Sequence, residues 1–440
     1  MKISKSNLLI IELLKNFLSL TNEEQHFFYA SPNDFTRKRH LDFQQIAMIV
    51  INLCKRSLSI DLEKYFETIS SRSTTLSAFC QQRLKLKWQF FCAWHFYLVQ
   101  CFYLVYNEKI YRWQGLRLVA VDGSTAYLMN KSKVIDYFGV QTNQAIEVPM
   151  ARIVNFFDVL NKISIWSTIQ PIECSEQKTV HNLLENMEDD MLGIYDRGYA
   201  GFAFFYLNIS GFEQEKKFIA RCSRQFRVVD QFIASGKKSQ IVSINPTQYA
   251  IKQLFEMGYK IDANETVKLR LVRIKLKTGE IEVIATNLMD EKLYPSDIFK
   301  WLYAKRWGIE TEYDALKNIY QIEQFSGYSP EVIQQDFYAT IFIANLHQIF
   351  IKDSEKDINA IGEKRQYKYQ HNRNVGFGLL KEEIVKLFIT DRPDIILQRL
   401  KLKFIRYLQP VRPGRSYPRE AKFRRTKGKY QTLTNYKRAA

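Results

Sequence analysis

The sequence predicts an α/β protein with a mixed β-sheet, flanking helices and a helical N-terminal domain. Residues 1 to about 110 place apolar side chains at helical spacing, and β-rich runs begin only at Leu116. Strand-like and helix-like segments then alternate along the chain. At 440 residues the chain is long enough for several domains. We expect three: a helical domain at 1–112, an α/β domain at 113–345, and a C-terminal helical region with a basic tail at 346–440.

The most apolar stretch of the helical region runs from Trp88 to Tyr106 and is long enough to suggest a membrane span. Gln89, His95 and Gln100 interrupt it, and its aromatic residues fill the middle rather than the ends. We therefore expect a buried helix. No charged segment followed by a short apolar core opens the chain, so we do not expect export.

The next part of the chain predicts a ribonuclease-H-like arrangement. Alternating and β-rich runs predict strands at 116–124, 151–160, 163–170 and 191–196, and amphipathic spacing predicts a helix at 175–190. The second and third strands are joined by Asn161 and Lys162, which suits an antiparallel hairpin. In a ribonuclease-H-like sheet built in this order, Asp122 and Asp196 would lie near adjacent strand ends.

A second β-rich region, at about 217–280, predicts an insertion in this fold. Residues 267–277 alternate polar and apolar side chains but slip phase at Leu271–Val272, which predicts a bulge. Thr278–Gly279 predicts a turn. One long helix is then expected from Ser296 or Asp297 onward.

The charge balance favours a polyanionic partner. Lys and Arg number 64 against 46 Asp and Glu, a formal net charge of +18, although a protein that is merely basic would share this feature. Residues 411–440 hold ten of these cations and one acidic residue, Glu420, as a nucleic-acid arm or a solvated tail would. The six cysteines form no Cys-x-x-Cys pair, which indicates neither a zinc site nor a disulfide framework and suits a reducing cytoplasm.

The expected long helix carries four residues at helical spacing. Tyr303, Arg306, Glu310 and Lys317 lie at relative positions 0, +3, +7 and +14, so on one continuous helix they project from one face. A carboxylate can hold Mg²⁺, and the arginine, lysine and tyrosine can bind phosphate oxygens. On spacing alone, a solvated charged face remains the simpler interpretation.

The whole pattern Tyr-x2-Arg-x3-Glu-x6-Lys is more specific than its parts. It resembles the Tyr-Arg-Glu-Lys signature of the DDE transposases of bacterial insertion sequences, whose core is ribonuclease-H-like with a β insertion. Val-Asp-Gly-Ser-Thr at 121–125 and Asp-Arg-Gly-Tyr at 196–199 are similar to that family's other two acidic motifs, in the right order. The resemblance covers about residues 30–345.

The resemblance implies roles for six residues. Asp122, Asp196 and Glu310 match the catalytic triad, which holds two Mg²⁺ ions, with Mn²⁺ as a substitute. The residues that match the DNA-gripping signature positions are Tyr303, Arg306 and Lys317. The implied partners are double-stranded DNA, as terminal inverted repeats and as target, and a second copy of the chain on DNA. A membrane is not among them, and the implied location is the bacterial cytoplasm, on the nucleoid.

Two other functions stay open at this point. A catalytically inactive, transposase-derived DNA-binding protein would not need the intact triad, and a metal-dependent nuclease without joining activity would share it. A DNA hairpin intermediate is also open. The aromatic residue that some relatives use for it is not matched, since the corresponding strand begins Glu280-Ile281-Glu282. Other nearby carboxylates, such as Asp136, Asp158 and Asp314, are interpreted as structural.

Overall fold

The computed structural model describes residues 5–412 except for 21, 38, 54, 144, 145, 225, 277 and 364. Most of the basic tail expected at 411–440 lies outside the described residues. The chain divides into two compact units. The first takes its residues from 1–108, 127–149 and 315–440, and the second from 109–126 and 150–314.

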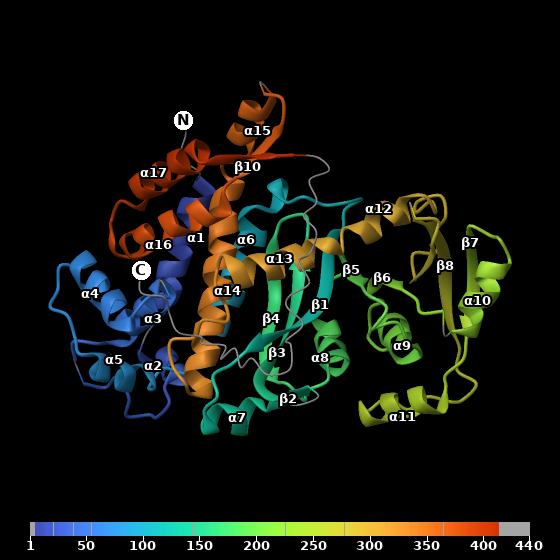
Figure 1. Ribbon diagram of the computed structural model, residues 1–440, viewed down its shortest axis with the longest axis horizontal. Coiled ribbons are helices and arrows are strands. Elements are labelled where there is room, and N and C mark those ends of the chain that lie inside the picture. Colours follow the sequence, from blue (N-terminus) through green and yellow to red (C-terminus); the bar gives the residue numbers. More distant parts are fainter. Residues whose placement is uncertain are drawn as a thin grey trace. The chain divides into compact units, whose positions relative to one another are not determined.

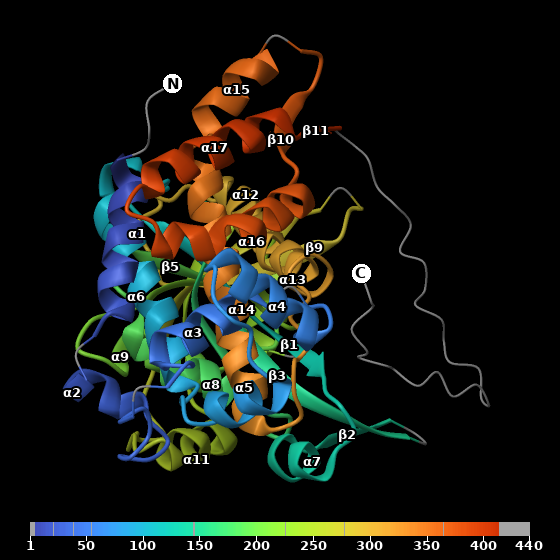
Figure 2. The ribbon, with the colours of Figure 1, turned by 90° about the vertical axis from the view of Figure 1, so that its left-hand side faces the viewer.

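The first unit is mainly helical (Figure 2). Its helices before residue 150 are α1 (Lys5–Leu18), α2 (Asn22–Gln25), α3 (Phe43–Asn52), α4 (Leu58–Thr68), α5 (Leu76–Arg83), α6 (Gln89–Val105) and α7 (Ser132–Phe138). Its later helices are α14 (Pro330–Lys352), α15 (Glu355–Glu363), α16 (Arg373–Ile389) and α17 (Pro393–Arg406). A small antiparallel sheet pairs β10 (Lys368–His371) with β11 (Leu408–Val411).

The core of this unit forms where α6 packs along α14. Trp94 of α6 stacks on Phe342 of α14, with ring centroids 4.5 Å apart. A buried ion pair joins Arg83 at the end of α5 to Asp336 of α14 over 2.7 Å. Helices from opposite ends of the sequence therefore share one apolar core.

The apolar stretch at 88–106 is α6, and its Phe90, Trp94, Leu98 and Phe102 are buried. The expected buried helix is confirmed. Among the described helices, none has both the length and the continuous apolar character needed to cross a membrane.

The second unit contains most of a nine-stranded mixed sheet (Figure 1). The strands are β1 (Arg117–Tyr127), β2 (Val140–Asn143), β3 (Ile146–Asp158), β4 (Ile163–Pro171), β5 (Met191–Tyr195), β6 (Lys217–Arg221), β7 (Ser239–Ile244), β8 (Val267–Lys275) and β9 (Ile281–Thr286). Their spatial order is β2-β3-β1-β5-β6-β9-β8-β7, and β4 also pairs with β3. β3 and β4 form the expected antiparallel hairpin, while β5 runs parallel to both β1 and β6. The predicted ribonuclease-H-like mixed sheet with flanking helices is confirmed.

The register of β1 and β5 places the two aspartates at matching positions. Ala120 pairs with Ile194, so Asp122 and Asp196 each lie two residues beyond the last aligned pair. Side chains alternate between the faces of a strand, and Leu118 and Ile194 belong to the apolar core formed with α12 (Ile298–Ala304). Asp122 and Asp196 have the same parity as these core residues, so the alternation directs both carboxylates to the α12 face.

The region expected to be an insertion extends the sheet rather than forming a separate layer. β9 pairs with β6, and β8 and β7 follow outward, with α10 (Arg227–Ala234) and α11 (Gln248–Glu256) in the connections. Its expected start at 217 coincides with β6. The prediction of a bulge at Leu271–Val272 was wrong, because β8 pairs in regular register with both β7 and β9. The apparent phase slip arises because Arg270 is itself buried, bonded to the carbonyl oxygens of Leu288 and Tyr294.

The single long helix expected after Asp297 is two helices, α12 and α13 (Trp307–Asn318), interrupted at Lys305–Arg306. At the interruption the backbone makes tight turns, in which the amide of Arg306 donates to the Tyr303 carbonyl over 3.0 Å. Gly308 brings the backbone against Val159, where an added Cβ would lie 3.0 Å from Cγ1. Glycine is a poor helix former, and this close packing favours the break.

Candidate active site

The second unit brings acidic residues from three distant segments to one place. Asp122 lies on β1, Asp196 directly follows β5, and Glu310 lies in the first turn of α13. The guanidinium of Arg306 connects two of them, with Nη1 3.5 Å from Oδ2 of Asp122 and Nη2 2.5 Å from Oε1 of Glu310. Arg306 itself is only 12% exposed, so these contacts are partly shielded from water.

The carboxylates of the site repel one another, and this repulsion affects the pKa of Asp122. The pKa of Asp122 is raised from its ordinary value of 3.8 to about 6. Burial is the main cause, the charge of Arg306 lowers the pKa, and the negative charges of Asp196 and Glu176 contribute to the rise. Asp196 and Glu176 are therefore close enough to act on Asp122. A divalent cation would relieve this repulsion.

Backbone and tyrosine groups hold the two aspartates in position. The amide of Gly123 donates to Oδ1 of Asp122 over 2.9 Å, and the Tyr313 hydroxyl donates to the Asp122 carbonyl over 2.8 Å. The amide of Gly198 donates to Oδ1 of Asp196 over 2.7 Å. The Gly that follows Asp122 and the Gly in the Asp-Arg-Gly-Tyr motif thus each supply a backbone donor.

Tyr303 places a hydroxyl in the same surroundings. Its side chain is buried, and the hydroxyl finds no hydrogen-bond partner among the described residues. Burial raises its pKa to about 12, although the charges of Arg221 and Arg306 act to lower it. A buried hydroxyl without a partner is costly and indicates a water molecule or a ligand that would complete its bonding.

The signature residues do not share one helix face as expected. The break before α13 separates Tyr303 on α12 from Glu310 on α13, while Arg306 lies in the interruption. Tyr303, Arg306 and Glu310 nevertheless meet in the second unit, because the tight turns at the break keep the chain close to a helical path. Lys317 belongs to the first unit, where its ammonium lies 3.5 Å from Glu323.

Three further residues of this region were missed from sequence. Glu176 opens α8 (Glu176–Leu183), where a carboxylate is common simply because it suits the helix dipole. Arg221 ends β6 and pairs with Glu282 over 2.7 Å. Tyr199 donates its hydroxyl to Glu176. Only Tyr199 lay within a recognised motif, and no local pattern distinguishes the other two.

The donor set suits a hard divalent cation, since carboxylate oxygens are the ligands that Mg²⁺ prefers. As the side chains stand, no group of three or more His, Cys, Asp or Glu among the described residues is arranged to hold a metal ion. Arg306 supplies the positive charge between Asp122 and Glu310. The residues fit the cation chemically, and binding it would require the guanidinium to move.

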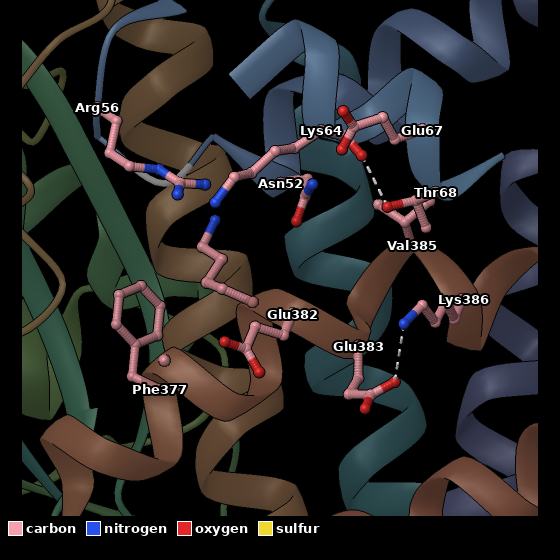
Figure 3. A pocket seen from close by; sticks show the side chains of 12 residues that line it. Asn52, Arg56, Lys64, Glu67, Thr68, Phe377, Glu382, Glu383, Val385 and Lys386 are labelled. Carbon is pink, nitrogen blue, oxygen red and sulfur yellow. Dashed lines mark hydrogen bonds and ion pairs between the residues drawn. The ribbon is translucent and has the colours of Figure 1, made fainter. Parts of the chain in front are cut away.

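A polar pocket in the first unit is a weaker candidate (Figure 3). Its wall carries cations and carboxylates from α4 and α16 and the segments beside them, but several are already engaged. Lys386 faces Glu383 over 3.9 Å, and Lys381 donates to the carbonyl oxygens of Ile51 and Leu53. Arg56 pairs with Asp61 over 3.2 Å. Few charges are left for a ligand, so this pocket does not compete with the acidic cluster.

The raised pKa of Asp122 predicts a pH-dependent stability. The folded protein binds this proton more tightly than the unfolded chain, so the free energy of unfolding should fall as pH rises from about 4 to about 6. The loss is at most about 3 kcal/mol, from the size of the shift. Asp122→Asn should therefore be more stable than the parent at pH 7.5 without metal, and no more stable at pH 4. Urea unfolding at both pH values checks this, and equal stabilities at pH 7.5 would contradict it.

The order and directions of its strands place the second unit in the ribonuclease-H-like class. The chain belongs to the transposase DDE domain family, whose match covers residues 113–346, more than half of the sequence. Among solved structures, it is similar to a piggyBac transposase synaptic complex with hairpin DNA. That match has a TM-score of 0.42 and 11% identity, and covers 91% of this chain and 81% of the other. No curated protein sequence matches the chain.

Proposed function

We propose that the protein is a DNA transposase of the bacterial insertion-sequence type with the Tyr-Arg-Glu-Lys signature. It would cut DNA at the ends of its element and join those ends to target DNA. The observation that carries the proposal is the contact of Arg306 with both Asp122 and Glu310, in a chain that belongs to the transposase DDE domain family. One guanidinium there joins two of the three motif carboxylates.

In this proposal Asp122, Asp196 and Glu310 hold two Mg²⁺ ions, and Mn²⁺ would substitute. When bound, such a pair activates a water molecule or a 3′ hydroxyl and stabilises the leaving 3′ oxygen. The Gly123 and Gly198 amides keep the two aspartates oriented for this task. Because one site serves both attacking groups, cutting and joining would use the same residues.

The remaining signature residues would bind DNA phosphates. Arg306 presents a planar fork that suits a phosphate as well as a carboxylate, and its present partners are the groups that would bind metal. Tyr303 offers a buried hydroxyl to a phosphate oxygen or an ordered water. Lys317 would contribute a point charge.

The partners follow from charge and family. The net charge of +18 favours double-stranded DNA, which would be bound both as terminal inverted repeats and as target. The protein would act as a homodimer assembled on paired transposon ends. It would do so in the bacterial cytoplasm, on the nucleoid.

The proposal is tested by incubating the purified chain with its element's end sequences and a supercoiled target plasmid in Mg²⁺. We expect cleavage at the ends, followed by joined products. Cleavage without joining would indicate a nuclease, and DNA binding without cleavage would indicate an inactive descendant. Either result would overturn the assignment.

The basic tail gives a separate prediction. Truncation after Arg412 keeps β11 but removes nine of the ten cations at 411–440. Affinity for specific and random DNA should fall by similar factors, because phosphate contacts carry no sequence information. The dependence of log Kd on log salt should also flatten. Fluorescence anisotropy at 50–300 mM salt measures both, and an unchanged slope would mean that the tail does not contact DNA.

A further inference from the structure

Glu176 lies beside the proposed metal site, although none of the transposase-like motifs contains it. It is the first residue of α8 and follows Ser175, whose side chain caps the helix by accepting from the Lys178 amide over 3.3 Å. The cap fixes the first turn of the helix, so the position of Glu176 is determined by secondary structure rather than by a loop. Its side chain is 30% exposed, similar to that of Glu310 at 32%.

The side chain of Glu176 reaches β1 at the residue after Asp122. A Cβ added at Gly123 would overlap the carboxyl group of Glu176 and lie 2.8 Å from its Cγ. Glycine at this position therefore makes room for the Glu176 carboxylate. Asp122 and Gly123 do not form a turn, because β1 continues through both residues to Tyr127. The contact with Glu176 therefore explains the glycine at position 123.

The contacts of Glu176 tie it to the acidic site. Tyr199, which closes the Asp-Arg-Gly-Tyr motif, donates its hydroxyl to Oε1. Burial raises the pKa of Tyr199 well above its usual value, and the nearby charges of Glu176 and Asp122 raise it further. Arg152 of β3 approaches Oε2 over 3.6 Å. The charges of Glu176 and Asp122 thus both raise the pKa of Tyr199.

The charges of the region are unbalanced. With Glu176 and Glu282 included, five carboxylates face three guanidinium groups, those of Arg306, Arg152 and Arg221, which leaves two negative charges when all the groups are ionised. The unpartnered buried hydroxyl of Tyr303 is an independent indication that something binds here. Like charges held together at partial burial are costly, and divalent cations would offset that cost.

We propose that Glu176 is a fourth carboxylate of the metal site, and that Gly123 is glycine because the Glu176 side chain must pass over it. The proposal rests on the proposed function, since it assigns one more residue to the same metal ions. It implies that Tyr199 and Arg152 hold Glu176 in place before metal binds.

The test measures Mn²⁺ binding to the full chain by titration calorimetry and by the electron paramagnetic resonance of free Mn²⁺. Glu176→Gln keeps the shape of the side chain and an acceptor for Tyr199 but removes the charge. We expect at least about tenfold weaker Mn²⁺ binding, with a thermal midpoint near that of the parent in the absence of metal. Glu173→Gln, which removes an exposed carboxylate just before α8, is the matched control and should bind Mn²⁺ like the parent.

Cleavage gives a second readout. If Glu176 acts on metal, the Mg²⁺ concentration for half-maximal cleavage should rise in Glu176→Gln, and saturating Mg²⁺ should restore part of the rate. Mn²⁺ affinity within twofold of the parent would overturn the role of Glu176. Failure of the parent chain to bind Mn²⁺ at all, or equal binding by Asp122→Asn, would instead count against the proposed function.

Gly123→Ala tests the contact from the other side. The added methyl group should displace the Glu176 carboxylate and weaken Mn²⁺ binding to a similar extent. If both changes act through one contact, the double variant Gly123→Ala/Glu176→Gln should bind Mn²⁺ about as weakly as either single variant. Additive losses would overturn the link between the two residues, and a thermal melt of each variant identifies any loss from misfolding.

Discussion

Replacing Asp122, Asp196 or Glu310 by alanine should reduce Mg²⁺-dependent cleavage of transposon ends by at least about 1000-fold, or about 4 kcal/mol of transition-state stabilisation. Each replacement removes one of the three motif carboxylates that we propose as metal ligands. Binding of the DNA ends should change by less than about threefold, because Lys and Arg provide most of the affinity for phosphate. Gel-based cleavage assays and fluorescence anisotropy on the same substrate measure the two effects separately.

Asp230→Asn is the control for these variants. Asp230 is exposed on α10, in the same unit but outside the acidic cluster, and its loss should leave cleavage unchanged. If an alanine variant of any of the three residues kept cleavage near the parent rate, that residue would have no place in the metal site.

The positions of the two aspartates could be predicted from sequence because strand order determines them. A strand, a hairpin, a helix and a further strand lead to parallel pairing of β1 and β5, and parallel neighbours end at the same edge of a sheet. Alternation along each strand then places Asp122 and Asp196 on one face. The periodicity of the strands and their order along the chain are therefore enough to predict that the two aspartates lie together.

Other parts of the site have no such local pattern. Just after the break between α12 and α13, Gly308 fits against Val159, a residue almost 150 positions earlier in the chain. Glu176 has the sequence context of an ordinary first-turn carboxylate, and only the structure places it over Gly123. Packing of α6 on α14 likewise joins segments more than 200 residues apart, so neither helix alone predicts its partner.

Arg306→Ala should reduce end-complex formation and strand transfer by about 100-fold, or about 3 kcal/mol. The reason is geometric, since the arginine fork reaches Asp122 and Glu310 together and would meet a phosphate held beside them. Arg306→Lys should remain at least about tenfold defective, because an ammonium keeps the charge but loses the two parallel donors. Strand-transfer assays with Arg227→Ala, which removes an exposed arginine of α10, provide the matched control.

Stability distinguishes this role of Arg306 from that of a solvated charged residue. Without metal, Arg306→Ala leaves Asp122 and Glu310 without their shared guanidinium, so the free energy of unfolding should fall by about 1 kcal/mol at pH 7.5. The loss should be smaller at pH 5, where the raised pKa of Asp122 keeps much of that carboxyl protonated even in the parent. Mg²⁺ should recover part of the stability at pH 7.5 by replacing the missing positive charge. A variant with normal strand transfer and parent-like stability at both pH values would show that Arg306 belongs to a solvated face and not to a phosphate-binding site.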